Sequence, residues 1–307
     1  MSFKYTAKVI IPTKITDTML ISCTVPEPAP GETVWVSGTT YAVNDIRILT
    51  STHKKYKLAI AGAGTVAPNL DTTNWVDIGA TARWAQFDAK IGTVTSAATS
   101  TTTVLDAGSV EGLALLELTG SSATVSMLEA PGGVVVYSKT VPLDGTVIES
   151  VYDWMFAPYE QRSSVILTDL PGQYPSGRLT VTIAGTTAAT GVLVVGNVLE
   201  IGATEYDAGA GIINYGKVLD DGFGGREWVE GAYSQRTTLP IVLEKQDFSR
   251  VYRALSKVRS TPCIYIGSEE TSFDPLVTYG VYKELYMTIP NYSICTYNLE
   301  IEGLSNI

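Results

Sequence analysis

Short apolar runs separated by Gly, Pro, Asn and Asp recur along almost the whole chain. Runs of this length between turn residues are typical of β-strands, because an amphipathic helix needs a longer stretch with a 3.6-residue period. The clearest runs are Lys8–Pro12, Met19–Val25, Gly112–Leu118, Ala123–Leu128, Gly133–Ser138, Ser163–Thr168, Arg178–Ile183 and Val192–Val195. The sequence therefore predicts a mainly all-β fold.

Changes in composition divide the chain into an N-terminal arm and three β units. Residues 1–34 form the expected arm, which ends in the stiff Pro-rich linker Pro26–Gly31 and is of a kind that packs on a neighbouring subunit. Residues 35–79 form a small aromatic β module, and residues 80–201 a β-sandwich of jelly-roll type. Residues 202–307 form a C-terminal β domain, entered through a long Gly-rich connection over 202–225.

One stretch has a helical pattern, from Asp247 to Val258. The apolar side chains follow the spacing of one helix face, and Asp247 is a suitable N-cap residue. These apolar residues are Phe248, Val251, Tyr252, Leu255 and Val258. Arg250, Arg253, Lys257 and Arg259 lie around or off this face. We expect one helix, carried by the C-terminal β domain.

The charge balance disfavours nucleic acid as a partner. The chain has 31 acidic and 21 basic residues, a net charge of −10, which repels a phosphate backbone. The densest basic cluster, His53-Lys54-Lys55 with Lys57, is short, and we interpret it as a solvated hairpin tip.

The three cysteines, Cys23, Cys263 and Cys295, are far apart and odd in number. This pattern fits reduced, mostly buried thiols better than a disulfide framework or a zinc site. The N-terminus has no signal-peptide pattern, and no apolar stretch is long enough to span a bilayer. We expect a soluble chain without membrane insertion that is not exported by the usual route.

No catalytic, metal-binding or cofactor-binding residue is predicted. His53 is the only histidine, which leaves Ser-His-Asp or Cys-His chemistry without support. Carboxylates occur in close pairs that we interpret as turn formers, as we do the Gly-rich segment Asp220–Gly225, whose alternative is a calcium loop. The pairs are Glu205 with Asp207, Asp220 with Asp221, Glu227 with Glu230, and Glu269 with Glu270.

The aromatic module has the spacing W-x5-Y-x3-D-x10-Y-x11-P-x6-W-x3-G from Trp35 to Gly79. It resembles the small aromatic modules of chitin-binding proteins, which occur in degenerate form in many bacteriophage tail proteins. The resemblance implies that Trp35, Tyr41 and Trp75 stack on a sugar, with Tyr56 as a secondary contact. The alternative is that these rings form the core of a module with few other large apolar residues.

Two further resemblances concern the rest of the chain. Residues 80–200 resemble galactose-binding-like domains in the order of their features, from the expected strand Arg83–Asp88 to the run ending at Asn197. Stretches along nearly the whole chain resemble one group of tailed-bacteriophage virion structural proteins. They are Ile15–Leu20, Trp35–Tyr41, Thr73–Gly79, Arg83–Asp88, Gly222–Gly224, Arg259–Pro262, Asp274–Gly280 and Leu299–Leu304.

The bacteriophage resemblance implies a non-enzymatic component of a tail tip, baseplate or collar, assembled in the host bacterial cytoplasm. Such a protein would bind other tail or fibre proteins and copies of itself. A second hypothesis is a receptor-recognition lectin that binds host-surface polysaccharide through Trp35, Tyr41 and Trp75. A third is a glycosidase that uses two of the carboxylates above.

Overall fold

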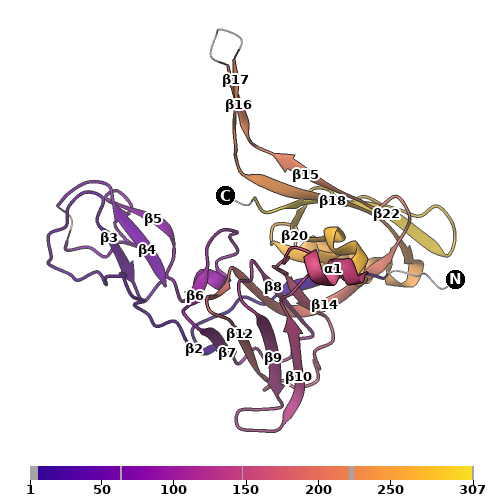
Figure 1. Cartoon of the computed structure of the whole chain (residues 1–307), viewed down its shortest axis with the longest axis horizontal. Coiled ribbons are helices and arrows are strands. Elements are labelled where there is room, and N and C mark those ends of the chain that lie inside the picture. Colours follow the sequence, from indigo (N-terminus) through magenta and orange to yellow (C-terminus); the bar gives the residue numbers. More distant parts are fainter. Residues whose placement is uncertain (1–5, 63, 147, 221–224, 306–307) are drawn as a thin grey trace.

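One ten-stranded antiparallel sheet organises most of the computed structural model, which describes residues 6–62, 64–146, 148–220 and 225–305 (Figure 1). About 46% of the residues are in strands and 9% are helical, which confirms the all-β prediction. The sheet order is β11 (Val165–Leu167), β8 (Gly112–Leu116), β14 (Val192–Thr204), β1 (Thr6–Pro12), β19 (Cys263–Ile266), β20 (Val277–Tyr282), β22 (Ile294–Gly303), β18 (Tyr233–Glu244) and β15 (Gly209–Asn214), with β21 (Met287–Thr288) beside β22.

Part of this sheet closes into a barrel. The end of β14 pairs with β18, Ala203 opposite Val242 and Thr204 opposite Ile241, so β14, β1, β19, β20, β22 and β18 form a ring. Closure pairs strand edges that would otherwise be exposed. Side chains from all six strands share one apolar cluster, which includes Val9, Tyr265 and Leu299.

Helix α2 (Phe248–Lys257) contributes Val251 and Leu255 to the barrel cluster, as the 3.6-residue pattern predicts. Tyr252, which the same pattern placed on the apolar face, is exposed. Its start differs from the prediction. Asp247 makes no N-cap hydrogen bond, because the 3₁₀ turn η2 (Lys245–Asp247) already places it in helical geometry. Its carboxylate instead lies 3.0 Å from Nη2 of Arg250.

The other end of the long sheet forms one layer of a sandwich. The second layer is a five-stranded sheet, and both layers contribute to a large apolar core that contains Leu113, Val165, Leu193, Leu105 and Met127. The order of the five strands is β10 (Val135–Pro142), β9 (Ser122–Leu128), β12 (Arg178–Ala184), β7 (Ser100–Leu105) and β2 (Leu20–Cys23).

The predicted boundary between residues 201 and 202 falls inside β14. The first residues of this strand pair with β8, and later ones pair with β1 and β18. The sandwich and the barrel therefore share a continuous strand rather than a linker. Strand β14 is apolar on both faces at its start because both faces are covered there.

The N-terminal segment is not the arm that the sequence suggested. Strand β1 lies between β14 and β19 in the barrel, and β2 lies at the edge of the sandwich. Val9 and Ile10 are fully buried on opposite faces of the sheet. Residues 6–23 are thus core elements of their own chain, because their apolar side chains fill both of its cores.

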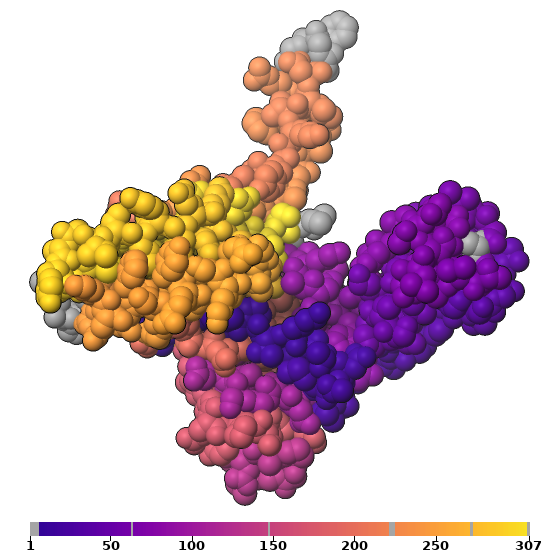
Figure 2. Space-filling view, turned by 180° about the vertical axis from the view of Figure 1, so that it is seen from behind, coloured from indigo at the N-terminus to yellow at the C-terminus, as the bar shows by residue number. Residues whose placement is uncertain are grey.

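The small aromatic module stands apart from the sandwich and the barrel, as Figure 2 shows at its indigo-to-purple lobe. Its three antiparallel strands are β3 (Ile46–Leu49), β4 (Lys54–Leu58) and β5 (Trp75–Ala80). The expected strand Arg83–Asp88 is instead the 3₁₀ turn η1 (Ala85–Phe87). Beyond it, β6 (Thr95–Ala97) pairs with β13 (Ala188–Thr190).

The Gly-rich connection predicted over 202–225 contains strands. Strand β15 pairs with β18, and beyond it β16 (Lys217–Asp220) pairs with β17 (Arg226–Val229). Beyond the barrel they form a two-stranded ribbon, residues 212–220 and 225–235, that projects from it (Figures 1 and 2). Two short helical elements were not predicted, α1 (Val151–Phe156) and η3 (Thr271–Leu276).

Candidate functional site

The four aromatic residues expected to bind sugar lie in or against the core of the small module. Tyr41, Tyr56 and Trp75 are buried together with Leu58, and Trp35 is half-buried against them. Only 2% of Trp75 is exposed. In this small module the large rings are the main source of apolar burial, so they fill its interior.

Contacts around these rings occupy the surfaces that a sugar would need. The rings of Tyr41 and Trp75 meet edge to face with centroids 5.5 Å apart, and the Arg47 guanidinium lies 5.0 Å from the Tyr41 ring centre. The Tyr41 hydroxyl donates to the carbonyl of Val36 and accepts from its amide. Tyr41, Tyr56 and Trp75 are buried, so none of these three rings offers an open face for stacking on a sugar.

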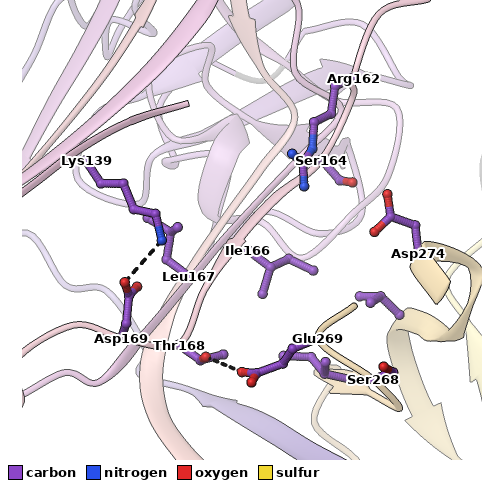
Figure 3. A pocket seen from close by; sticks show the side chains of 12 residues that line it. Lys139, Arg162, Ser164, Ile166, Leu167, Thr168, Asp169, Ser268, Glu269 and Asp274 are labelled. Atoms are coloured by element: carbon purple, nitrogen blue, oxygen red, sulfur yellow. Dashed lines mark hydrogen bonds and ion pairs between the residues drawn. The ribbon is translucent and has the colours of Figure 1, made fainter. Parts of the chain in front are cut away.

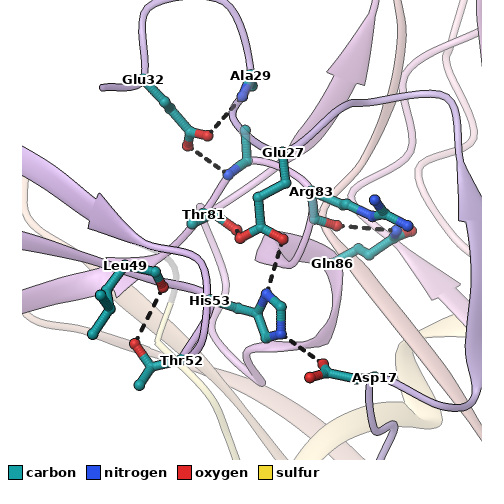
Figure 4. Close-up of polar contacts among 11 residues, drawn as sticks. Asp17, Glu27, Ala29, Glu32, Leu49, Thr52, His53, Thr81, Arg83 and Gln86 are labelled. Carbon is teal, nitrogen blue, oxygen red and sulfur yellow. Dashed lines mark hydrogen bonds and ion pairs between the residues drawn. The ribbon is translucent and has the colours of Figure 1, made fainter. Parts of the chain in front are cut away.

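His53 joins the module to the segment that precedes it, and it is not a solvated tip residue (Figure 4). Its Nδ1 lies 2.8 Å from Oε2 of Glu27, and its Nε2 lies 2.6 Å from Oδ1 of Asp17. The imidazole also stacks on the Trp84 indole, with centroids 4.3 Å apart. The His53 side chain therefore connects the small module to the segment before it, through Asp17 and Glu27, and to the segment after it, through Trp84.

The neighbouring lysines are engaged in the same junction. Lys55 forms an ion pair with Glu32 at 3.2 Å, and Lys54 pairs with Asp77 across the module sheet. Glu32 also accepts hydrogen bonds from the amides of Ala29 and Ala82. The basic cluster is therefore partly neutralised by local carboxylates.

A groove of about 950 Å³ opens beside this junction. Its volume lies within the range of sites for small ligands. Lys14 and Lys90 line it without a recorded ion pair among the described residues, and Asp88 lines it with a pKa raised by burial. Trp84 and Phe87 supply its aromatic wall. This groove combines aromatic and charged groups, which the module core does not.

A second pocket, of about 310 Å³, lies where the sandwich meets the barrel (Figure 3). Asp169 accepts hydrogen bonds from Tyr137 and Lys139, and Glu269 accepts from Lys8 at 2.8 Å and from Thr168 at 2.5 Å. Figure 3 shows Lys139 directed toward Asp169, and Thr168 of the sandwich directed toward Glu269 of the barrel. The cluster ties strand β1 and the end of β19 to the sandwich.

The electrostatics of this pocket do not suit glycoside hydrolysis. Burial alone would raise the pKa of Asp169 and of Glu269, but the hydrogen bonds that each accepts outweigh burial, and both pKa values are lowered. A glycosidase needs one carboxyl group whose pKa is raised, so that it can donate a proton near neutrality. With lowered pKa values, Asp169 and Glu269 are both charged near neutrality, as their hydrogen-bonding partners favour.

The other paired carboxylates are not brought to a common site. Glu205 and Asp207 follow the end of β14, where Asp207 has a φ of 78°, a turn conformation. Glu227 and Glu230 are exposed on the ribbon. Asp221 and most of the Gly-rich loop Asp220–Gly225, including Gly222–Gly224, lie outside the described residues. Within the described ranges no group of three metal-ligating side chains occurs.

The sequence patterns did not predict two exposed apolar surfaces. The first is the α1 loop, residues 148–160, which includes the exposed side chains of Tyr152, Trp154 and Phe156. The second is the ribbon, where every residue of β16 and β17 is exposed, including Trp228. The pattern Ser150-x-x-Asp153 is the signal that could have located α1, because Ser150 accepts from the Asp153 amide as an N-cap.

Comparison of the chain with models of known protein families, with curated proteins and with solved structures found no match. The helices of the described residues are all too short or too polar to cross a lipid bilayer.

Proposed function

We propose that this chain is a non-enzymatic structural protein of a bacteriophage tail, at the tip, baseplate or collar. It assembles in several copies and docks neighbouring tail or fibre proteins. The bacteriophage assignment rests on the sequence resemblance, and the docking role rests on one structural observation, the ribbon. An assembly protein needs an exposed surface whose apolar side chains and unpaired strand edges become covered when a partner binds.

The ribbon has that property. Within the described part of the chain, β16 and β17 pair only with each other, and the exposed side chains of Val218, Leu219 and Trp228 lie along them. A two-stranded ribbon is marginally stable in water, and its unpaired edges accept further strands. Exposed apolar side chains on such an element mark an interaction site. The ribbon is therefore the docking element of the proposed tail protein.

Removal of the outer ribbon tests this role. Asn214 and Tyr233 are paired partners at its base, so residues 215–232 can be replaced by an Asn-Gly turn. We expect the shortened chain to keep the unfolding temperature of the full chain and to lose higher-order assembly in mass photometry. Unchanged assembly would remove the ribbon from the proposal.

The bacteriophage assignment has its own test. Antibodies raised against the purified chain should label the tails of particles released by the bacterium that encodes it, in immunogold electron microscopy. Particles that lack the protein altogether would refute the virion assignment, whatever the ribbon does in the purified chain.

A second candidate function is recognition of a host-surface polysaccharide, and the junction groove favours it. Three of the four module rings are buried and Trp35 is half-buried, so we expect a glycan to bind between Trp84, Lys14 and Lys90 instead. Binding to a glycan array that is lost in Lys14→Ala/Lys90→Ala and kept in Lys57→Ala would support this function. Glycan binding that survives in Lys14→Ala/Lys90→Ala as well as in Lys57→Ala would exclude the groove as the glycan-binding site.

A further inference from the structure

The outer surface of α2 is basic in an otherwise acidic chain. Residues 245–259 contain five basic side chains and one carboxylate, a net charge of +4 in a chain of −10. The other residues therefore carry −14. We call this surface the α2 face; its members are Lys245, Phe248, Arg250, Tyr252, Arg253, Lys257 and Arg259.

Four cations of the α2 face have no recorded carboxylate partner among the described residues, and one of them, Lys245, lies 4.2 Å from the centre of the Tyr292 ring. Arg253 donates only to the carbonyl of Ser249, Arg259 donates to that of Ser256, and Lys257 has no recorded hydrogen bond. Arg250 is the exception, since it pairs with Asp247. Aromatic surface accompanies these charges, because Phe248 stacks on the exposed Tyr252. The α2 face can therefore accept an acidic partner that also has aromatic rings.

The α1 loop has the complementary chemistry. Between residues 148 and 160 there are three carboxylates, Glu149, Asp153 and Glu160, and no basic residue. Its large apolar side chains are exposed, and Trp154 retains 73% of its accessible surface. Helix α1 has no buried residue at all, so its own chain does not cover it. A helix of this kind is stabilised when a partner covers its rings.

We propose that the α2 face of one copy binds the α1 loop of a second copy. The inference rests on the proposed function, which requires several copies, and it names the surfaces that join them. Guanidinium groups of the α2 face stack on the rings of Tyr152, Trp154 and Phe156, while Glu149 and Glu160 meet the free cations. Opposite charges on the two surfaces steer the encounter.

A second copy accounts for both surfaces, whereas other occupants account for one. An anionic membrane would cover the rings of the α1 loop but repel its three carboxylates. A nucleic acid would cover the α2 face, but the −14 charge of the other residues opposes its approach. The α2 face supplies cations and the α1 loop supplies carboxylates and exposed rings, so contact between two copies pairs the charges of both surfaces and covers the rings.

The test uses charge reversal on the full-length chain. One variant has Arg253→Glu and Lys257→Glu, which reverses two free cations of the α2 face with a good helix former and changes the net charge of residues 245–259 from +4 to 0. The other has Glu149→Lys and Glu160→Lys, which leaves the N-cap pair Ser150 and Asp153 intact. Matched controls make the same charge changes elsewhere, at exposed residues without a recorded ion pair: Lys14→Glu/Lys57→Glu and Glu129→Lys/Glu205→Lys.

Association is measured by sedimentation velocity at low salt. We expect each reversed variant to associate at least tenfold more weakly than the wild type, and each control to remain within about twofold. Raising the salt to about 0.5 M should weaken wild-type association, because it screens charges at this range. Trp154→Ala, which alters no charge, should also weaken it. Circular dichroism of every variant checks that the fold is retained.

Mixing identifies the contact. Each variant retains one normal surface, and the two altered surfaces are complementary to each other as well. An equimolar mixture should therefore associate in a one-to-one ratio although each variant alone associates weakly. Combining both pairs of substitutions in one chain should restore part of the self-association, because the substituted positions of the two surfaces exchange their charges. Weak association of the mixture and of the doubly reversed chain would overturn the contact, as would wild-type behaviour of either reversed variant.

These outcomes are separate from those of the proposed function. If the wild type assembles and reversal leaves it unchanged, the α1–α2 contact is wrong while the assembly role stands. If the wild type is monomeric up to about 100 µM at low salt, the contact between copies is also overturned. The tail assignment is then decided by immunogold labelling alone.

Discussion

Nδ1 of His53 lies 2.8 Å from Oε2 of Glu27, and this contact joins the tip of the small module to the segment that leads into it. Glu27 is nearly buried, and its other oxygen accepts a hydrogen bond from Thr81 Oγ1 at 2.8 Å. One carboxylate therefore connects two turns of the module to the segment before it. Four predictions test this and other structural relationships.

Glu27→Ala should lower the free energy of unfolding by about 1–3 kcal/mol, because it leaves His53 and Thr81 without their acceptor in a half-buried junction. Chemical denaturation checks the value. As a control, Glu129→Ala removes an exposed carboxylate without a recorded partner and should change it by less than about 0.5 kcal/mol. Equal effects of the two substitutions would contradict the role of Glu27.

Trp75→Ala should destabilise the small module by about 3–5 kcal/mol, since it removes the largest buried side chain of a small core. Hydrogen exchange should show lost protection in β3, β4 and β5 and unchanged protection in β9 and β12. Trp154→Ala removes an exposed ring and serves as the control. Uniform loss of protection throughout the chain would show that the module does not unfold by itself.

Gly280→Ala should prevent the barrel from closing. A Cβ atom at this position would lie 2.0 Å from the carbonyl oxygen of Glu302 on the paired strand, and backbone atoms cannot move aside cheaply. We expect insoluble protein or an unfolding temperature lower by at least 10 °C, because β20 and β22 must separate. Gly209→Ala, where no atom lies within 4 Å, should fold normally.

Glu269→Gln should make stability less dependent on pH under acidic conditions. The pKa of Glu269 is lowered in the folded state, so the folded protein binds fewer protons than the unfolded chain below neutrality. Its contribution is present above the ordinary pKa of about 4.5 and is lost as the pH falls through the lowered folded value. Urea denaturation between pH 3 and 7 should give a flatter profile for the variant.

If the Glu269→Gln profile parallels that of the wild type, the contact with Lys8 does not contribute to stability. Glu129→Gln is the matched control, and its profile should follow the wild type throughout. The pKa of Asp169 is also lowered in the folded state, so the stability of the variant should still fall somewhat at acidic pH.

Much of the secondary structure followed from local pattern. The alternation in Arg178–Ile183 predicted β12, and the stripe through Val251 and Leu255 predicted α2. Local pattern was insufficient where the same residues are compatible with a loop and with a strand. The Gly-rich stretch after Gly202 reads as a loop, yet its residues pair across the ribbon because β18 supplies a partner strand.

The candidate site was less predictable than the fold. The spacing of Trp35, Tyr41 and Trp75 is compatible with an exposed platform or with a core, since periodicity does not say which face is covered. The structure buries Tyr41 and Trp75, and it directs attention to Trp84 and His53. His53 lacked any sequence signal, because its partners Glu27 and Asp17 lie in a separate segment.

The sequence by itself determined the β character of the chain, its single long helix and its acidic charge, because each depends on neighbouring residues or on composition. The tertiary structure alone decided that β1 is a barrel strand rather than an arm. Lys8 pairs with Glu200 and Ile266, which are far along the chain. The choice of a strand's partner depends on which distant apolar faces can be buried together, and no local pattern contains that information.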